Sequence, residues 1–121
     1  ALATCRRLIE PAATNQDIIS SVENLLREKL RQRPSMTDIA SWLNITERTL
    51  RRHLTEAGQR FSDIRDRVME QRARILLSNS TMPIANIAEE LGFSDARDFR
   101  RAFRRWTGLT PMELRQEMRK P

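Results

Sequence analysis

The chain is poor in the residues that build metal sites, disulfides and phosphate-binding loops. Its 121 residues include one cysteine, Cys5, and one histidine, His53. One cysteine cannot form an internal disulfide, and a single histidine beside it leaves too few ligands for a zinc site. No glycine-rich phosphate loop and no paired histidine and carboxylate motif occurs either. The sequence therefore predicts no metal site, no cofactor and no enzymatic activity.

Turn-forming and strand-forming residues are also scarce. There are three glycines and five prolines, tyrosine is absent, and 31% of the residues are charged. Together with little alternation of β-branched residues, this composition is typical of an all-α fold. The sequence has no apolar run long enough to span a membrane and no signal-peptide pattern. We therefore expect a soluble, cytoplasmic helical protein.

Positive charge is what the chain has in excess. The formal net charge is +6 and the sequence pI is about 11.1. Such a balance favours a polyanionic partner, either nucleic acid or an anionic membrane surface. Excess arginine also serves solubility in many helical domains, so charge alone does not decide between these readings.

Two segments of the chain repeat one pattern. Residues 38–46 and residues 86–94 each contain an Ile-Ala pair, and the two pairs lie 48 positions apart. Each segment is typical of a short helix, a tight turn and a hydroxyl residue that caps an arginine-rich second helix. This order is that of a helix-turn-helix. Two such motifs in one chain make DNA reading the leading hypothesis.

Helix signals divide the chain into four parts. We expect a linker or lead-in over residues 1–14, a first helix-turn-helix unit over 15–58, a connector helix over 59–80 and a second unit over 81–121. Because the chain begins without methionine and its first residues lack helical periodicity, we expect it to be the C-terminal piece of a larger protein. The expected helix caps are Asn15, Ser35, Thr46, Ser94 and Thr110.

The second helix of each motif combines arginines with an apolar stripe. Residues 94–108 hold five arginines against two aspartates, and residues 46–58 hold three arginines against two glutamates. The planar fork of arginine can make two hydrogen bonds to a guanine edge in the major groove. A solvated outer face is the plainer explanation for one such helix, but the matched pair favours DNA.

The buried stripes of the two helices do not match in register. Leu50 and Leu54 correspond to Phe99 and Phe103 with an offset of 49 instead of 48. We expect one extra residue between the cap and the first buried side chain of the second motif, and therefore a slightly different entry into DNA. Both tryptophans, Ile75 and Leu76 are expected to face the core or pack between helices. For His53 a polar flank and a phosphate contact both stay open.

A long pattern in the second half of the chain has a family resemblance. It consists of Ile84, Ile87, Ala88, Gly92, Phe93, Ser94, Phe99, Arg101, Phe103, Arg104, Gly108, Thr110, Pro111 and Arg115 at fixed spacing. This pattern resembles the signature of the AraC/XylS family of bacterial transcription regulators, and the similarity extends over roughly residues 18–118. The resemblance implies seven helices that form two helix-turn-helix units joined by a central helix.

The resemblance also implies roles for particular residues. Double-stranded DNA would be read in adjacent major grooves, in the manner of an activator that contacts RNA polymerase. The domain alone would be monomeric and away from membranes, while a missing N-terminal domain could dimerise the full-length protein. The expected base-reading residues are Arg48, Arg51, Arg52, Ala96, Arg97 and Arg101. The expected phosphate contacts come from Thr46, Thr49, Ser94, Arg100 and Arg104.

Three positions depart from the family pattern or leave the function open. Met69 stands where the family commonly has arginine, and Leu54 replaces a phenylalanine. Asp98 lies among the expected DNA-facing residues, where its carboxylate could accept a hydrogen bond from cytosine, pair with a neighbouring arginine or repel phosphate.

Two rival functions remain: a helical module that binds an acidic protein surface, and architectural binding of DNA without sequence choice.

Overall fold

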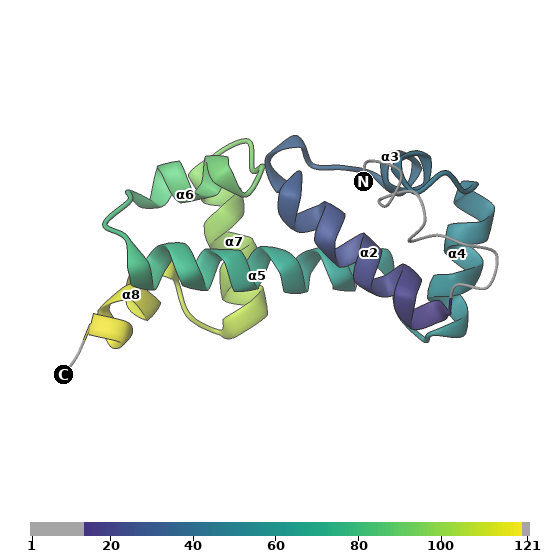
Figure 1. Ribbon diagram of the computed structural model, residues 1–121. Coiled ribbons are helices and arrows are strands. Elements are labelled where there is room, and N and C mark those ends of the chain that lie inside the picture. Colours follow the sequence, from purple (N-terminus) through teal and green to yellow (C-terminus); the bar gives the residue numbers. More distant parts are fainter. Residues whose placement is uncertain (1–13, 120–121) are drawn as a thin grey trace. The chain divides into compact units, whose positions relative to one another are not determined.

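The computed structural model describes residues 14–119, which form only helices (Figure 1). They are α2 (Asn15–Glu28), the short 3-10 helix η1 (Leu30–Gln32), α3 (Met36–Trp42), α4 (Glu47–Glu56), α5 (Phe61–Asn79), α6 (Ile84–Glu90), α7 (Ala96–Thr107) and α8 (Pro111–Arg119). The predicted all-α fold is confirmed. The lead-in expected at residues 1–14 lies outside the described residues except for Thr14. No described helix is both long and apolar enough to cross a membrane.

The chain forms two compact units that interleave in sequence. The first takes in the described residues up to Lys29 together with Pro34–Arg65. The second takes in Leu30–Arg33 together with the described residues from Asp66 onward. The short segment that contains η1 therefore belongs to the second unit, and α5 begins in one unit and continues in the other.

The first unit buries one face of each of its helices. In this unit α4 packs against α2 and α3. Its buried side chains are Ile18, Ile19, Val22, Leu26, Ile39, Ala40, Leu43, Leu50, Leu54 and Ile64. Along α2 and α4 these residues recur three or four positions apart, which places them on one side of each helix. The opposite side of α4 is left to polar residues.

The start of α2 differs from the sequence prediction. Thr14, not Asn15, is the cap, and it exchanges hydrogen bonds with Asp17 in a capping box. The Asn15 amide oxygen instead lies 2.6 Å from Nδ1 of His53 on α4. His53 is therefore a half-buried link between α4 and α2, on the flank of the helix rather than on its outer face.

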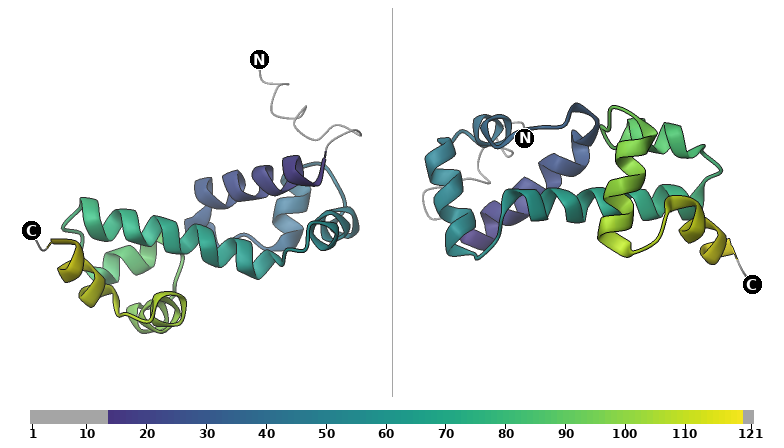
Figure 2. Two further views of the ribbon diagram at one scale, coloured as in Figure 1. Left: turned by 90° about the horizontal axis from the view of Figure 1, so that it is seen from below. Right: turned by 180° about the vertical axis from the view of Figure 1, so that it is seen from behind.

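The second unit has an aromatic core. Here α7 packs against α6 and α8, and η1 packs against α6; Figure 2 shows α7 running across the later part of α5. Phe99 and Phe103 are fully buried with ring centroids 5.8 Å apart, as predicted. Phe93 contacts Phe99 at 5.5 Å, and the half-buried Trp106 contacts Phe103 at 6.3 Å. Such tilted and edge-to-face contacts between rings stabilise a core beyond the area that they bury.

A buried arginine closes the end of the connector helix. Arg115 of α8 is 7% exposed, and its Nε donates to the Leu77 carbonyl at 3.2 Å. Its Nη2 donates to the carbonyls of Leu76 and Ser80, both at 3.4 Å. The last carbonyls of a helix have no partner inside the helix, so this guanidinium supplies one. Burial lowers the pKa of Arg115 below its ordinary value, and the nearby charge of Arg119 adds to this.

Two apolar residues expected in the core or between helices are exposed at the surface. Ile75 on α5 is 47% exposed and Trp42 on α3 is 38% exposed. The Trp42 ring has Nζ of Lys29 5.0 Å from its centroid, a cation–π contact within the first unit. Placing Ile75 in the core was wrong, whereas Leu76 is buried as predicted; for Trp42, expected in the core or packed between helices, the exposure excludes the core. Met69, the methionine at the departure from the family pattern, is also buried.

The turns of the two motifs have the same backbone geometry. The Ile45 N–H donates to the Ala40 carbonyl at 3.1 Å, and the Phe93 N–H donates to the Ala88 carbonyl at 3.0 Å. These six-to-one bonds define a Schellman motif, which needs a residue with positive φ just before the donor. Asn44 with φ 60° and Gly92 with φ 86° fill that position.

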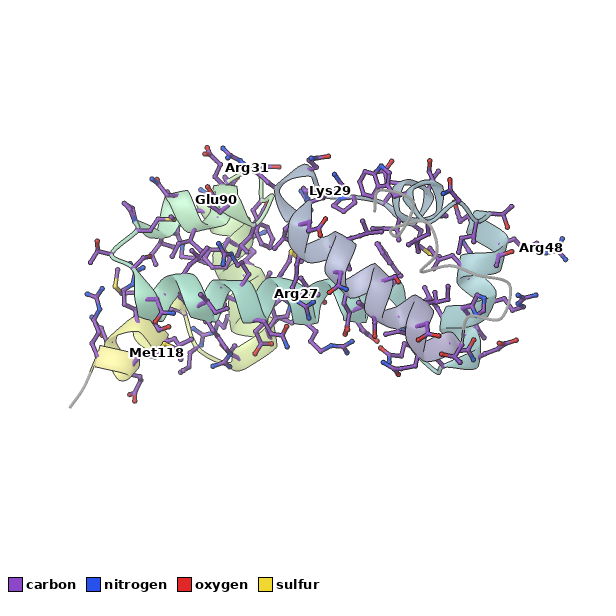
Figure 3. The ribbon with its side chains drawn as sticks, viewed as in Figure 1. Arg27, Lys29, Arg31, Arg48, Glu90 and Met118 are labelled. Atoms are coloured by element: carbon purple, nitrogen blue, oxygen red, sulfur yellow. The ribbon has the colours of Figure 1, made fainter. Side chains whose placement is uncertain are left out.

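Gly92 is also close to η1, which fixes where the second turn lies. A Cβ atom at this position would stand 2.7 Å from the Leu30 carbonyl oxygen and 2.5 Å from Cγ of Arg33. In the same segment Arg31 pairs with Glu89 at 3.2 Å and with Glu90 at 3.8 Å (Figure 3). The turn is thus held between its own hydrogen bonds and this short helix.

We predict that Gly92→Ala destabilises the protein far more than Gly58→Ala. Both glycines have positive φ, but a Cβ at Gly58 would meet nothing within 4 Å. Gly58→Ala should therefore lower the free energy of unfolding by about 1–2 kcal/mol, the cost of the backbone alone. Gly92→Ala should lower it by roughly 3 kcal/mol or more, because the Leu30 carbonyl cannot move freely. Urea unfolding measures both, and equal losses would contradict the close packing.

Candidate nucleic-acid interface

The outer face of α4 carries the arginines of the first motif. Leu50 and Leu54 face the core, which leaves Arg48, Arg51 and Arg52 exposed on the remaining surface of the helix. Figure 3 shows Arg48 projecting outward from α4. All three predicted base-reading residues of this motif are therefore accessible to a ligand.

These three arginines differ in their partners. Nη2 of Arg51 lies 2.6 Å from Oε2 of Glu47, and Nε of Arg52 lies 4.0 Å from Oε2 of Glu56. Within residues 14–119 the Arg48 guanidinium makes no ion pair. Among the three exposed arginines of α4, Arg48 is therefore the one without an acidic partner within the described residues, whereas Arg51 is held by a short hydrogen bond to Glu47.

The start of α4 agrees with the sequence prediction. The Thr46 hydroxyl oxygen accepts from the backbone N–H of Thr49 at 3.0 Å, as a cap should. The same hydroxyl donates to the hydroxyl oxygen of Thr49 at 3.0 Å. Thr46 is exposed and Thr49 is half-buried, so the two predicted phosphate contacts lie together at the N-terminal end of the helix.

The cap of α7 was predicted wrongly. Asp95, not Ser94, is the cap, and its carboxylate accepts from the Asp98 N–H at 2.9 Å. A carboxylate is favourable at this place because it offsets the positive end of the helix dipole. Ser94 is an exposed turn residue, so its expected role as a helix cap beside a phosphate does not apply.

This correction moves the extra residue of the second motif. Thr46 and Asp95 each precede the first buried residue of their helix, Leu50 or Phe99, by four positions. The stretch between the positive-φ residue and the cap is one residue longer in the second motif, where it contains Ser94. The extra residue thus lies in the turn, and the two helices have the same register from cap to core.

The outer face of α7 is a row of cations. Arg97, Arg100, Arg101, Arg104 and Arg105 are all exposed. Within the part of the chain that the structure describes, none of these side chains forms an ion pair. The pKa of Glu113 is lowered chiefly by the backbone N–H and hydroxyl of Thr110, and Arg104 contributes less. This helix presents more unpaired positive charge than α4 does.

Two further residues stand at the start of α7. Ala96 is half-buried in the first turn, so only part of its methyl group faces outward. Asp98 is exposed, and among residues 14–119 its carboxylate forms no ion pair, so of the three alternatives left open the pairing with Arg97 or Arg101 is not observed. Both side chains remain open to a ligand.

Comparison with known proteins identifies the family. A family model described as a helix-turn-helix domain matches residues 39–117. The chain is similar to the regulator VqsM of Pseudomonas aeruginosa, with 43% identity over 84 residues that cover 69% of this chain and 26% of that protein. The chain belongs to the AraC-type helix-turn-helix family. The family resemblance stated from the sequence is thereby confirmed, and the family is one of transcription regulators rather than enzymes.

Solved structures of AraC-type regulators have the same fold. The crystal structure of CdpR from Pseudomonas aeruginosa matches with TM-score 0.71 and 39% identity over 87% of this chain and 32% of that one. A transcriptional regulator with an AraC-type DNA-binding domain from Chromobacterium violaceum matches with TM-score 0.79 and 26% identity over 88% and 96%. The chain thus spans about a quarter to a third of VqsM and CdpR, and nearly the whole of the third protein.

We predict that removing the observed cap, and not the expected one, weakens α7. Asp95→Ala should lower the free energy of unfolding by about 1 kcal/mol, because the Asp98 N–H loses its acceptor. Ser94→Ala should change it by less than about 0.5 kcal/mol, as for an ordinary exposed position. Thermal and urea unfolding of the two variants decide between the caps. A larger loss for Ser94→Ala would contradict the geometry described.

Proposed function

We propose that this chain binds double-stranded DNA sequence-specifically and regulates transcription, with α4 and α7 each in a major groove. One observation carries the proposal: each motif buries one face of its second helix and leaves exposed arginines on the other. A helix fits the major groove, where each base pair shows a distinct pattern of donors and acceptors. Membership of the AraC-type family supports the same function.

We assign the contacts by position and pairing. Base edges are read by Arg48, Arg51, Arg52, Ala96, Arg97 and Arg101, where the Ala96 methyl would suit a thymine methyl. Phosphates are held by Thr46, Thr49, Ser94, Arg100 and Arg104. For Ser94 the contact would come from an exposed turn residue instead of a helix cap. The many unpaired cations make the affinity strongly dependent on salt.

The wider assembly is also part of the proposal. The domain binds as a monomer, since two reading helices in one chain can cover an asymmetric site. The longer protein to which such a domain commonly belongs would supply effector binding and dimerisation, and contact with RNA polymerase would make it an activator. This follows the family resemblance and the fact that the chain spans about a quarter of VqsM.

Selection from a random pool of double-stranded DNA tests the function. We expect enrichment of an asymmetric motif whose two parts are centred about 10 base pairs apart, one helical turn, as two helices in successive grooves require. Footprinting of one bound chain should protect both grooves. Binding without enrichment would instead support an architectural role, and absence of binding would support an acidic protein partner.

Two single substitutions serve as matched controls on the selected sequence. Arg101→Ala should relax base preference at one position by about tenfold, because a bidentate base contact supplies about 1–3 kcal/mol. Arg104→Ala should weaken selected and scrambled DNA alike, as expected for a phosphate contact. Equal losses on all sequences for Arg101→Ala would count against its base-reading role.

A further inference from the structure

A three-residue chain of hydrogen bonds joins the two helices of the first motif. The hydroxyl of Thr37 on α3 donates to Oε1 of Glu47 at 2.6 Å. Nη2 of Arg51 donates to the other carboxylate oxygen, Oε2, also at 2.6 Å. Glu47 stands at the first position of α4, so its carboxylate lies between the preceding helix and an arginine one turn further along.

This arrangement is unlike the other arginine pairs near the candidate interface. Arg52 has an acidic partner at the same i,i+4 spacing, but its Nε lies 4.0 Å from Oε2 of Glu56, and within residues 14–119 no second contact holds that carboxylate. In the second motif the positions that correspond to Thr37 and Glu47 are Ala85 and Ala96. That motif therefore has no equivalent of the chain of bonds.

We propose that Glu47, held by Thr37, is a positioning residue that fixes the guanidinium of Arg51 and thereby sets the base preference of the first motif. The inference rests on the proposed DNA-binding function. It gives Glu47 a role that its charge alone would not suggest, since a carboxylate near DNA phosphates is otherwise unfavourable.

The physical reason is pre-organisation. A free arginine side chain has substantial rotamer entropy, much of which is lost when the side chain binds in one geometry. An arginine already held in place loses less on binding, and its remaining N–H donors stay available to a base. An exposed pair alone stabilises little, so the second anchor on the carboxylate is what distinguishes Arg51 from Arg52.

The ionisation of Glu47 fits this role. The hydrogen bond from Thr37 lowers the pKa of Glu47 below its ordinary value, and Arg51 adds to the lowering, against a raising effect of burial. The carboxylate therefore stays ionised at neutral pH and accepts both bonds. Charge-assisted hydrogen bonds of this kind are shorter and stronger than neutral ones.

Thr37→Val and Thr37→Ser separate positioning from a merely structural role. Thr37 is exposed and lies outside α4, and the two variants differ in whether they keep the hydroxyl. In the DNA-free protein, nuclear magnetic resonance relaxation of the Arg51 side-chain nitrogens should show greater mobility in Thr37→Val and unchanged mobility in Thr37→Ser. Glu56→Gln is the matched control and should leave Arg51 unchanged. Unchanged Arg51 mobility in Thr37→Val would overturn the proposal.

Binding measurements test whether Thr37 affects the base preference. The probes are the duplex selected by the wild-type chain, the same duplex changed at the base pair that Arg51→Ala affects, and a scrambled duplex. Thr37→Val should reduce the preference for the first over the second about three- to fivefold, the net effect of one ordinary hydrogen bond, with unchanged binding to the scrambled duplex. Thr37→Ser should keep the preference, and Thr37→Val should have no further effect in an Arg51→Ala background.

The outcomes distinguish the two proposals. If the wild-type chain selects a motif but Thr37→Val leaves its base preference intact, positioning by Glu47 is wrong and the DNA-binding function stands. An additional loss from Thr37→Val in the Arg51→Ala background would also overturn it, because the effect would not pass through Arg51. If the wild-type chain enriches no sequence, the proposed function fails and this inference fails with it.

Discussion

The backbone hydrogen bond that closes each helix-turn-helix turn is the constraint on which the rest of each motif depends. It joins Ile45 to Ala40 in one motif and Phe93 to Ala88 in the other. The bond ends the first helix at a residue with positive φ and sets the direction in which the second begins. Once that direction is set, the apolar stripe of the second helix reaches the core and its arginines face outward.

The two motifs use this shared scaffold with different side chains. The first buries Leu50 and Leu54, while the second buries Phe99 and Phe103 within a cluster of aromatic rings. The arginines of the two helices also differ in whether they have acidic partners. Two of the three on α4 have acidic partners one turn away, whereas those on α7 are unpaired within the described residues. We therefore propose that base preference which depends on a fixed side-chain geometry comes from α4, and that most of the phosphate attraction comes from α7.

The sequence predicted the local features of the fold well. Periodic apolar residues, Gly92 at a turn and the cap at Thr46 are short-range signals, and the structure confirms them. It predicted poorly wherever two residues compete for one role or where the contact lies far along the chain. Ser94 and Asp95 can both cap a helix, and only the offset of 49 between the buried stripes indicated the second.

Long-range contacts explain the remaining differences. Helical spacing cannot show that Lys29 covers Trp42, or that Arg115 supplies donors to carbonyls 38 positions earlier. The i,i+4 spacing of Glu47 and Arg51 is a local signal that could have indicated a pair, whereas the contact from the hydroxyl of Thr37 on another helix has no such signal. The residues assigned to base edges and phosphates remain proposals, because position on a helix does not reveal which groove atom each side chain meets.

The salt dependence of DNA affinity tests the central claim that α7 supplies more of the phosphate attraction than α4. The affinity of the selected duplex is measured against salt concentration for two variants that each lose three arginines: Arg48, Arg51 and Arg52 to alanine, or Arg100, Arg104 and Arg105 to alanine. We predict that the α7 variant loses about 2 units of the logarithmic slope, roughly 0.9 for each of the phosphate contacts of Arg100 and Arg104, and that the α4 variant, whose arginines are assigned to bases, loses less than about 1. Equal losses would contradict it.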